Sequence, residues 1–222
     1  MKCLFEGEVL EIIPQAGGMI FSYCKEKTEA GIGLGCKMVT FETGVMTEVA
    51  EDIYLLSKFG TNYAATSKTA VDYISAKAIV LPSGRVFVCL KDGSASLIDG
   101  DGTPLWQGEL VYKGRSPSAM ALSKNAFWAV YKKENVLLRY NLLTMREDLR
   151  IGGSESPFNR PNSIFVEEST AYVACPADKK VVKVGLEDYA FSTYLRFKEP
   201  VYNYLKIKDF EFVHLRSGLY IV

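Results

Sequence analysis

A pair of short apolar segments separated by a turn occurs four times in this chain. The first segment of each pair is rich in aromatic and β-branched residues, and the second segment is again apolar. The first segments are VFVCL, AFWAVY, AYVAC and FEFVHL, and the turns that follow them are KDGS, KKEN, PADKK and RSG. Apolar strands joined by such turns are typical of β-hairpins. The sequence therefore predicts a repeated hairpin, and the repeat constrains the fold more than any other feature.

Aligned on their hairpins, the repeats place one residue of each in a shared column. These residues are Tyr23, Cys89, Val130, Cys175 and His214. A short strand precedes each hairpin (VLEIIP, KAIVLP, SAMALS, NSIFVE and NYLKI), and a further strand follows the first four (VMTEVAE, PLWQGELVY, MREDLRIGG and AFSTYLRF). Four strands in a period of about 40 to 45 residues match one blade of a β-propeller. We therefore predict an all-β, five-bladed propeller.

The fifth repeat has only three strands, because the sequence ends directly after LYIV. The first segment, Met1 to Val9, is extended and has no other partner, so we expect it to complete the last blade. Such closure removes the exposed sheet edges of an open array. Residues 1–222 would then form a single propeller domain. The alternative is a fragment of a six- or seven-bladed propeller.

One repeat carries a resemblance to known families. The stretch RPNSIFVEESTAYVACPADKKVVKVGLED resembles the repeats of NHL, YVTN and gluconolactonase-like propellers, in which a Pro-x-x-apolar strand leads into a hairpin. The stretch LIDGDGTPLW is slightly similar to a PQQ-type repeat. The resemblance covers most of the chain from Ala76 onward. It implies a propeller fold, and its motifs are structural.

Charge and cysteine content limit the classes of partner. Lys plus Arg equals Asp plus Glu at 26 each, with no long basic block, so we expect neither nucleic acid nor a membrane as partner. Glu6, Glu8 and Glu11 interrupt the N-terminal segment, which therefore lacks the apolar run of a signal peptide or a membrane span. Five cysteines without a CxxC pair predict reduced thiols that are small buried residues, and a cytoplasmic location.

A polar residue stands near the start of each predicted innermost strand. These residues are Glu11, Lys77, Ser118, Asn162 and Asn203. Innermost strands surround the central channel of a propeller, so these side chains are expected to form a ring at the channel mouth that binds a small polar ligand. The alternative is a water-filled polar tunnel without a ligand. We call these five residues the mouth ring.

The gluconolactonase-like resemblance implies acid and amide ligands for a divalent metal at comparable strand starts. Glu11 and Asn162 match that pattern, but Asn203 stands where a carboxylate base is needed, and a neutral amide cannot accept the proton. Lys77 also brings a positive charge to the same mouth. Cys89, Cys175 and His214 belong to different blades, which excludes a zinc site. We therefore predict no cofactor and a non-enzymatic propeller that binds a ligand or a protein, with a metal-dependent lactonase or glycosidase-like hydrolase as the alternative.

The first repeat is longer than the others by about 20 residues. The excess divides between CKEKTEAGIGLGCK, expected to be a long flexible hairpin connection, and KFGTNYAATSKTAVDY. The second insert is rich in Tyr, Ser, Thr and Asn, a composition typical of recognition loops, so Tyr63 and Tyr73 are predicted to contact a partner. A passive connection is the alternative. The intervening TEVAEDIYLLSKF is interpreted as a strand and a loop, with a short helix as the alternative.

Overall fold

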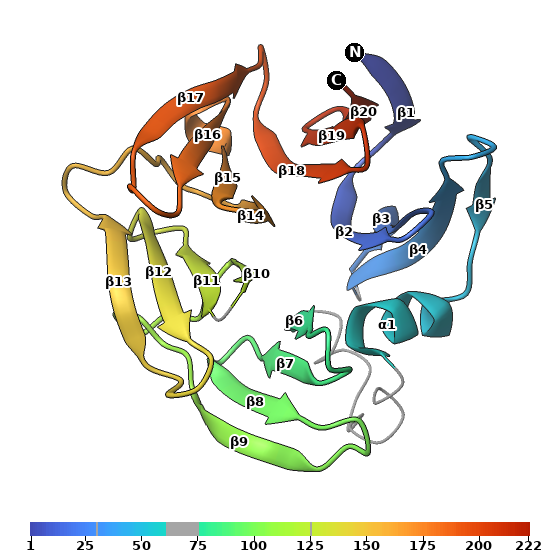
Figure 1. Ribbon diagram of the computed structural model, residues 1–222. Helices are drawn as coiled ribbons and strands as arrows, with labels where there is room; N and C mark the ends of the chain where they lie inside the picture. Colours follow the sequence, from blue (N-terminus) through green and yellow to red (C-terminus); the bar gives the residue numbers. More distant parts are fainter. Residues whose placement is uncertain (30, 61–75, 125) are drawn as a thin grey trace.

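The computed structural model describes residues 1–29, 31–60, 76–124 and 126–222. Five antiparallel sheets of four strands each surround a central axis (Figure 1). This arrangement confirms the predicted five-bladed propeller.

Each blade is one sheet, with its innermost strand beside the axis. Blade 1 contains β2 (Val9–Gln15), β3 (Gly18–Thr28), β4 (Gly31–Thr40) and β5 (Met46–Glu48). Blade 2 contains β6 (Lys77–Val80), β7 (Val86–Cys89), β8 (Ser94–Ile98) and β9 (Pro104–Glu109). Blade 3 contains β10 (Ala119–Ser123), β11 (Ala126–Tyr131), β12 (Val136–Asn141) and β13 (Glu147–Gly152). Blade 4 contains β14 (Ser163–Glu167), β15 (Thr170–Cys175), β16 (Lys180–Gly185) and β17 (Phe191–Arg196), with a short 3-10 helix at Pro176–Asp178. Blade 5 contains β18 (Val201–Ile207), β19 (Phe210–Leu215), β20 (Gly218–Ile221) and β1 (Lys2–Glu6).

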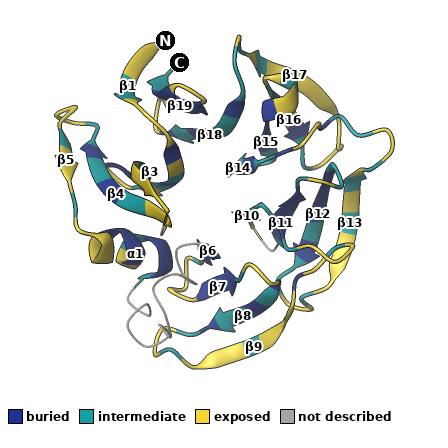
Figure 2. Ribbon diagram, turned by 180° about the vertical axis from the view of Figure 1, so that it is seen from behind, coloured by how far each residue is buried: buried dark blue, intermediate teal, exposed yellow. Residues whose placement is uncertain are grey.

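The middle strands of the blades are apolar on both faces because each blade packs between two others. On β11, Phe127, Ala129 and Tyr131 lie in the hydrophobic cluster shared with blade 2, whereas Trp128 and Val130 lie in the cluster shared with blade 4. Side chains alternate between the two faces of a strand, so a strand buried on both faces needs a continuous apolar run. The outermost strands are largely exposed (Figure 2).

The ring is closed by the N-terminal strand. β1 pairs with β20 in antiparallel register from Lys2 opposite Ile221 to Glu6 opposite Gly218, which confirms the predicted completion of the last blade. Gly218 allows this pairing, since a Cβ at that position would lie 2.1 Å from the carbonyl oxygen of Phe5. Blade 5 also packs against blade 1 through one hydrophobic cluster, so the two ends of the blade series are in contact.

The strand-and-loop interpretation of TEVAEDIYLLSKF is wrong after β5, and the helical alternative is correct. Helix α1 spans Glu51–Phe59 and lies between blades 1 and 2. Its buried residues Tyr54, Leu55, Lys58 and Phe59 follow helical spacing. The helix has too few turns for that stripe to stand out in the sequence.

The predicted flexible connection at GIGLG is also wrong, because these residues begin β4. The β3–β4 ladder continues to the pair Thr28 and Gly31. Gly35 allows the Tyr23 side chain to lie across the ladder, since a Cβ at residue 35 would be 2.3 Å from the Tyr23 ring. The glycines therefore accommodate cross-strand packing within a long hairpin.

Candidate functional site

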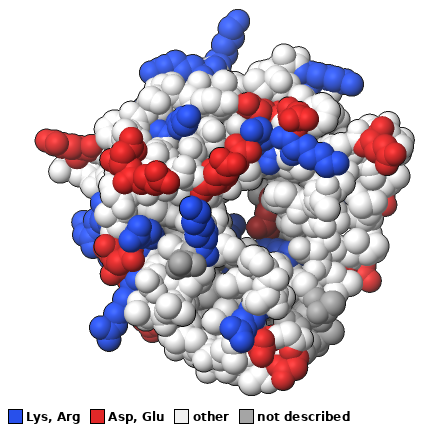
Figure 3. All heavy atoms as spheres, viewed as in Figure 1, with Lys and Arg blue, Asp and Glu red and all other residues white. Residues whose placement is uncertain are grey.

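The five innermost strands surround a cavity of about 860 Å³ at the centre of the propeller. Figure 3 shows its opening, with acidic and basic side chains inside the rim. A volume of this size falls within the range of small-molecule sites. β2, β6, β10, β14 and β18 all contribute to the lining.

All five mouth-ring residues line this cavity. They lie at or just before the starts of the innermost strands, or within the first residues of β2 and β18, so the structure brings them to one end of the channel. In three blades the mouth-ring residue lies opposite the residue of the aligned column, and in two blades the register differs by one residue. Glu11 pairs with Ser22 and not Tyr23, and Ala119 pairs with Val130, which places Ser118 opposite Tyr131.

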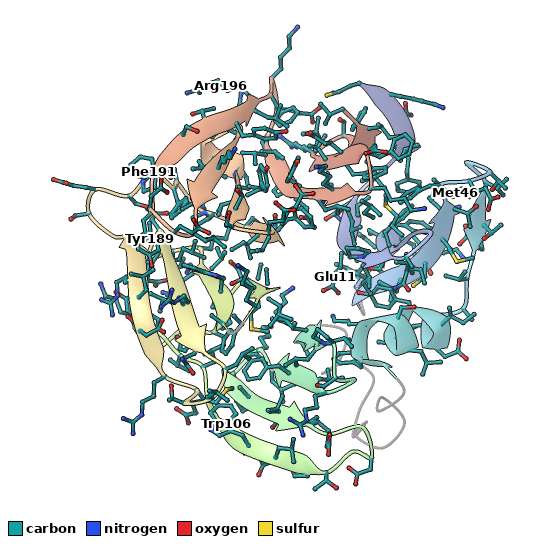
Figure 4. All side chains as sticks on the ribbon, in the orientation of Figure 1. Glu11, Met46, Trp106, Tyr189, Phe191 and Arg196 are labelled. Carbon is teal, nitrogen blue, oxygen red and sulfur yellow. The ribbon has the colours of Figure 1, made fainter. Side chains whose placement is uncertain are left out.

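Glu11 is held by two residues of α1. Its carboxylate accepts a hydrogen bond from the Tyr54 hydroxyl and one of 2.7 Å from Lys58 Nζ. The Lys58 side chain is only 3% exposed. Burial lowers the pKa of Lys58; the Glu11 carboxylate opposes this shift, and the positive charge of Lys77 adds to it. Glu11 lies at the edge of the central opening (Figure 4).

Ser118 and Asn162 link neighbouring blades. Ser118 Oγ donates to the carbonyl oxygen of Val130 at 3.0 Å and lies 3.5 Å from that of Pro161, which precedes blade 4. Asn162 Oδ1 accepts a hydrogen bond of 2.8 Å from Lys132 Nζ, while Nδ2 donates to the Tyr202 carbonyl oxygen of blade 5 at 2.9 Å. These two side chains hold the mouth together as well as lining it.

Lys77 and Asn203 differ from the other mouth-ring residues. Both are half-buried, and neither side chain has a hydrogen bond or an ion pair within residues 1–29, 31–60, 76–124 and 126–222. Asn203 pairs with His214, which is 8% exposed and lies against the Tyr202 ring at a centroid distance of 5.3 Å and an interplanar angle of 38°. Burial lowers the pKa of His214 to about 4, so its imidazole is neutral at pH 7. The mouth thus has polar groups available to a ligand.

Within the described parts of the chain, no three His, Cys, Asp or Glu side chains are grouped closely enough to hold a metal ion. Cys89 and Cys175 are buried in separate blades, and burial raises the pKa of their thiols to about 12 and about 11. All five cysteines are unpaired. Cys36 is also buried, but Cys3 is exposed and Cys24 half-exposed, so the expectation of small buried residues holds for only three of the five.

Two predicted contact residues, Tyr63 and Tyr73, lie outside the described residues. Among the described helices, none combines the length and the apolar character needed to cross a membrane. The sequence interpretation missed Tyr54 and Lys58 as parts of the site because it did not place them on a helix. The acidic pair Glu51 and Asp52 followed by Lys58 was the available signal, since this order suits a helix dipole.

No protein-family profile matches the chain. Its fold is similar to Sqt1 from Saccharomyces cerevisiae, with a TM-score of 0.56 and 10% identity over 96% of this chain and 71% of that one. Virginiamycin B lyase from Staphylococcus aureus gives a TM-score of 0.52 and 10% identity over 100% of this chain and 72% of that one. The computationally designed Ika8 protein gives 0.52 and 11% over 96% of this chain, which spans 57% of the design's length. These similarities confirm the resemblance to propeller proteins and, at such identities, concern the fold alone.

Proposed function

We propose that this protein is a non-enzymatic binding propeller that takes a small polar ligand at the channel mouth. The observation that carries the proposal is the convergence of five polar side chains from five blades on one end of a cavity of about 860 Å³. Lys77 and Asn203 supply hydrogen-bond donors that a ligand can use, and the other three are held in place by neighbouring elements. Largely pre-formed pockets with a few convergent polar groups are typical of ligand sites.

The donor set favours binding over metal-dependent hydrolysis. In the described part of the chain two carboxylates line the cavity, and each is ion-paired: Glu11 with Lys58 and Glu8 with Lys27. A divalent cation would have to replace an ammonium group at Glu11 and would meet the positive charge of Lys77 nearby. Asn203, as an amide, cannot act as a general base. The mouth ring therefore serves to bind a ligand. The five unpaired thiols support a cytoplasmic location for the protein.

A crystallographic fragment screen with small polar molecules tests this function. We expect the bound fragments to gather at the mouth and to contact both Lys77 and Asn203. The affinity of the best fragment, measured by calorimetry, should fall by about ten-fold in Asn203→Ala, because a hydrogen bond to the ligand is lost.

Lys133→Gln serves as a control outside the cavity. Lys133 is exposed in the β11–β12 turn and does not line the cavity. Its replacement should leave the affinity unchanged. Fragments bound only outside the channel, or an affinity unaffected by Asn203→Ala, would contradict the proposed function.

A further inference from the structure

We propose, on the premise of this binding function, that the ligand is an organic anion with an apolar body. Its acidic head would lie at the mouth between Lys77 and Arg216, and its apolar part would extend along the channel. The inference rests on the charge balance of the lining and on the distribution of its apolar residues.

Among the residues that the structure describes, the lining contains more cations than anions. Its charged residues there are Glu8, Glu11, Lys27, Lys58, Lys77 and Arg216. Lys27 pairs with Glu8 at 2.6 Å and Lys58 pairs with Glu11 at 2.7 Å, so each carboxylate already has a cation. Neither remaining cation has a salt bridge to another described residue. The mouth therefore carries an excess of positive charge that a bound anion would neutralise.

The two cations flank blade 1 at the mouth. Lys77 begins β6 in blade 2, and Arg216 follows β19 in blade 5. Asn203, also in blade 5, lines the same cavity and adds an amide donor. Lys77 lies close enough to the buried Lys58 for its positive charge to lower the pKa of that ammonium group. A carboxylate or phosphate head placed here would relieve this repulsion and receive charge-assisted hydrogen bonds.

Beyond the mouth, apolar side chains form part of the lining. The strands continue with Ile13, Pro14, Met120, Leu122 and Val166, all of which line the cavity and are half-buried or exposed. Water in contact with these side chains is displaced favourably by an apolar group. An inorganic anion would leave this wall in water, and a neutral apolar molecule would leave Lys77 and Arg216 without a counter-charge. The ligand class that satisfies both regions has an acidic head and an apolar body.

Three matched probes test the inference by calorimetry on the full chain: 4-phenylbutyrate, 4-phenylbutanol and inorganic phosphate. We expect 4-phenylbutyrate to bind at least about ten-fold more tightly than the other two, because only this probe satisfies both regions. Lys77→Gln and Arg216→Gln should each weaken its binding by about ten-fold. Lys133→Gln is the control, because it removes a cation outside the cavity by the same kind of substitution. It should alter binding by less than about two-fold.

Reversal of the charges at Lys77 and Arg216 predicts a gain of binding, which a loss of stability cannot produce. The double variant Lys77→Glu with Arg216→Glu should lose 4-phenylbutyrate and gain 4-phenylbutylamine, since the sign of the mouth is inverted. If 4-phenylbutanol binds as tightly as 4-phenylbutyrate, the ligand does not need an acidic head. If phosphate binds as tightly, the ligand does not need an apolar body. Either result would overturn the inference. Neutral polar fragments in the channel with no binding of 4-phenylbutyrate would overturn this inference and leave the proposed function standing. A channel that binds neither would overturn both.

Discussion

At the scale of single residues, His214 links the stability of the propeller to pH. It is the only histidine in the chain, and burial lowers its pKa in the folded state to about 4. The unfolded chain has an ordinary pKa of about 6.5 and therefore binds more protons between these values, so stability falls as the pH falls. We expect the free energy of unfolding to fall by about 3 kcal/mol from pH 6.5 to pH 4, and most of this loss to occur above pH 4.5. Urea unfolding at a series of pH values measures the loss.

The matched variant for this measurement is His214→Gln, which keeps a polar side chain that does not titrate. Its free energy of unfolding should vary little between pH 6.5 and pH 4.5. Carboxylates whose pKa is lowered in the fold, such as Asp92 and Asp178, change the stability mainly below pH 4.5. A variant with the same pH slope as the wild type would show that another group is responsible.

At the scale of elements, α1 offers two adjacent leucines with opposite environments. Leu55 is 3% exposed in the cluster between blades 1 and 2, whereas Leu56 is 44% exposed. Leu55→Ala should lower the free energy of unfolding by about 2 to 4 kcal/mol, because it leaves a cavity beside the blades. Leu56→Ala removes the same atoms from the same helix and should cost less than about 0.5 kcal/mol. Denaturant unfolding compares them, and equal losses would mean that α1 does not pack between the blades.

At the scale of the whole molecule, β1 closes the ring, so its removal should affect the entire propeller. Phe5 packs against Phe21 and Tyr23 of blade 1, with ring centroids 5.2 and 5.0 Å apart. Deletion of residues 1–6 should lower the free energy of unfolding by about 2 kcal/mol, because it removes the partly buried Phe5 and the β1–β20 pairing. It should also expose the edge of β20 and promote association, measured by light scattering.

A synthetic peptide of residues 1–7 should restore the stability of the truncated chain when added in trans. The same peptide with Phe5→Ala is its control and should restore much less. A truncated chain as stable as the full chain would show that β1 contributes nothing to closure.

The sequence by itself determined the strands, the number of blades and the closing strand. The hairpins follow from local chemistry, because alternating apolar residues and turn residues act over a few neighbouring positions. Closure followed from counting, since blade 5 lacked one strand and Met1 to Val9 had no other partner. The mouth-ring residues were found in the same way: the start of each innermost strand is a local feature, and the repeat places all five at one end of the channel.

Only the tertiary structure decided what surrounds those residues. Lys58 pairs with Glu11 from 47 positions away, through a helix whose apolar stripe is too short to stand out in the sequence. The pairing of Glu11 with Ser22 depends on an irregularity in the ladder between Val9 and Glu11, and a one-residue shift of this kind does not appear in an apolar pattern. The excess positive charge of the mouth depends on which charges meet across the ring. Such contacts are set by packing between blades, which the local sequence pattern does not encode.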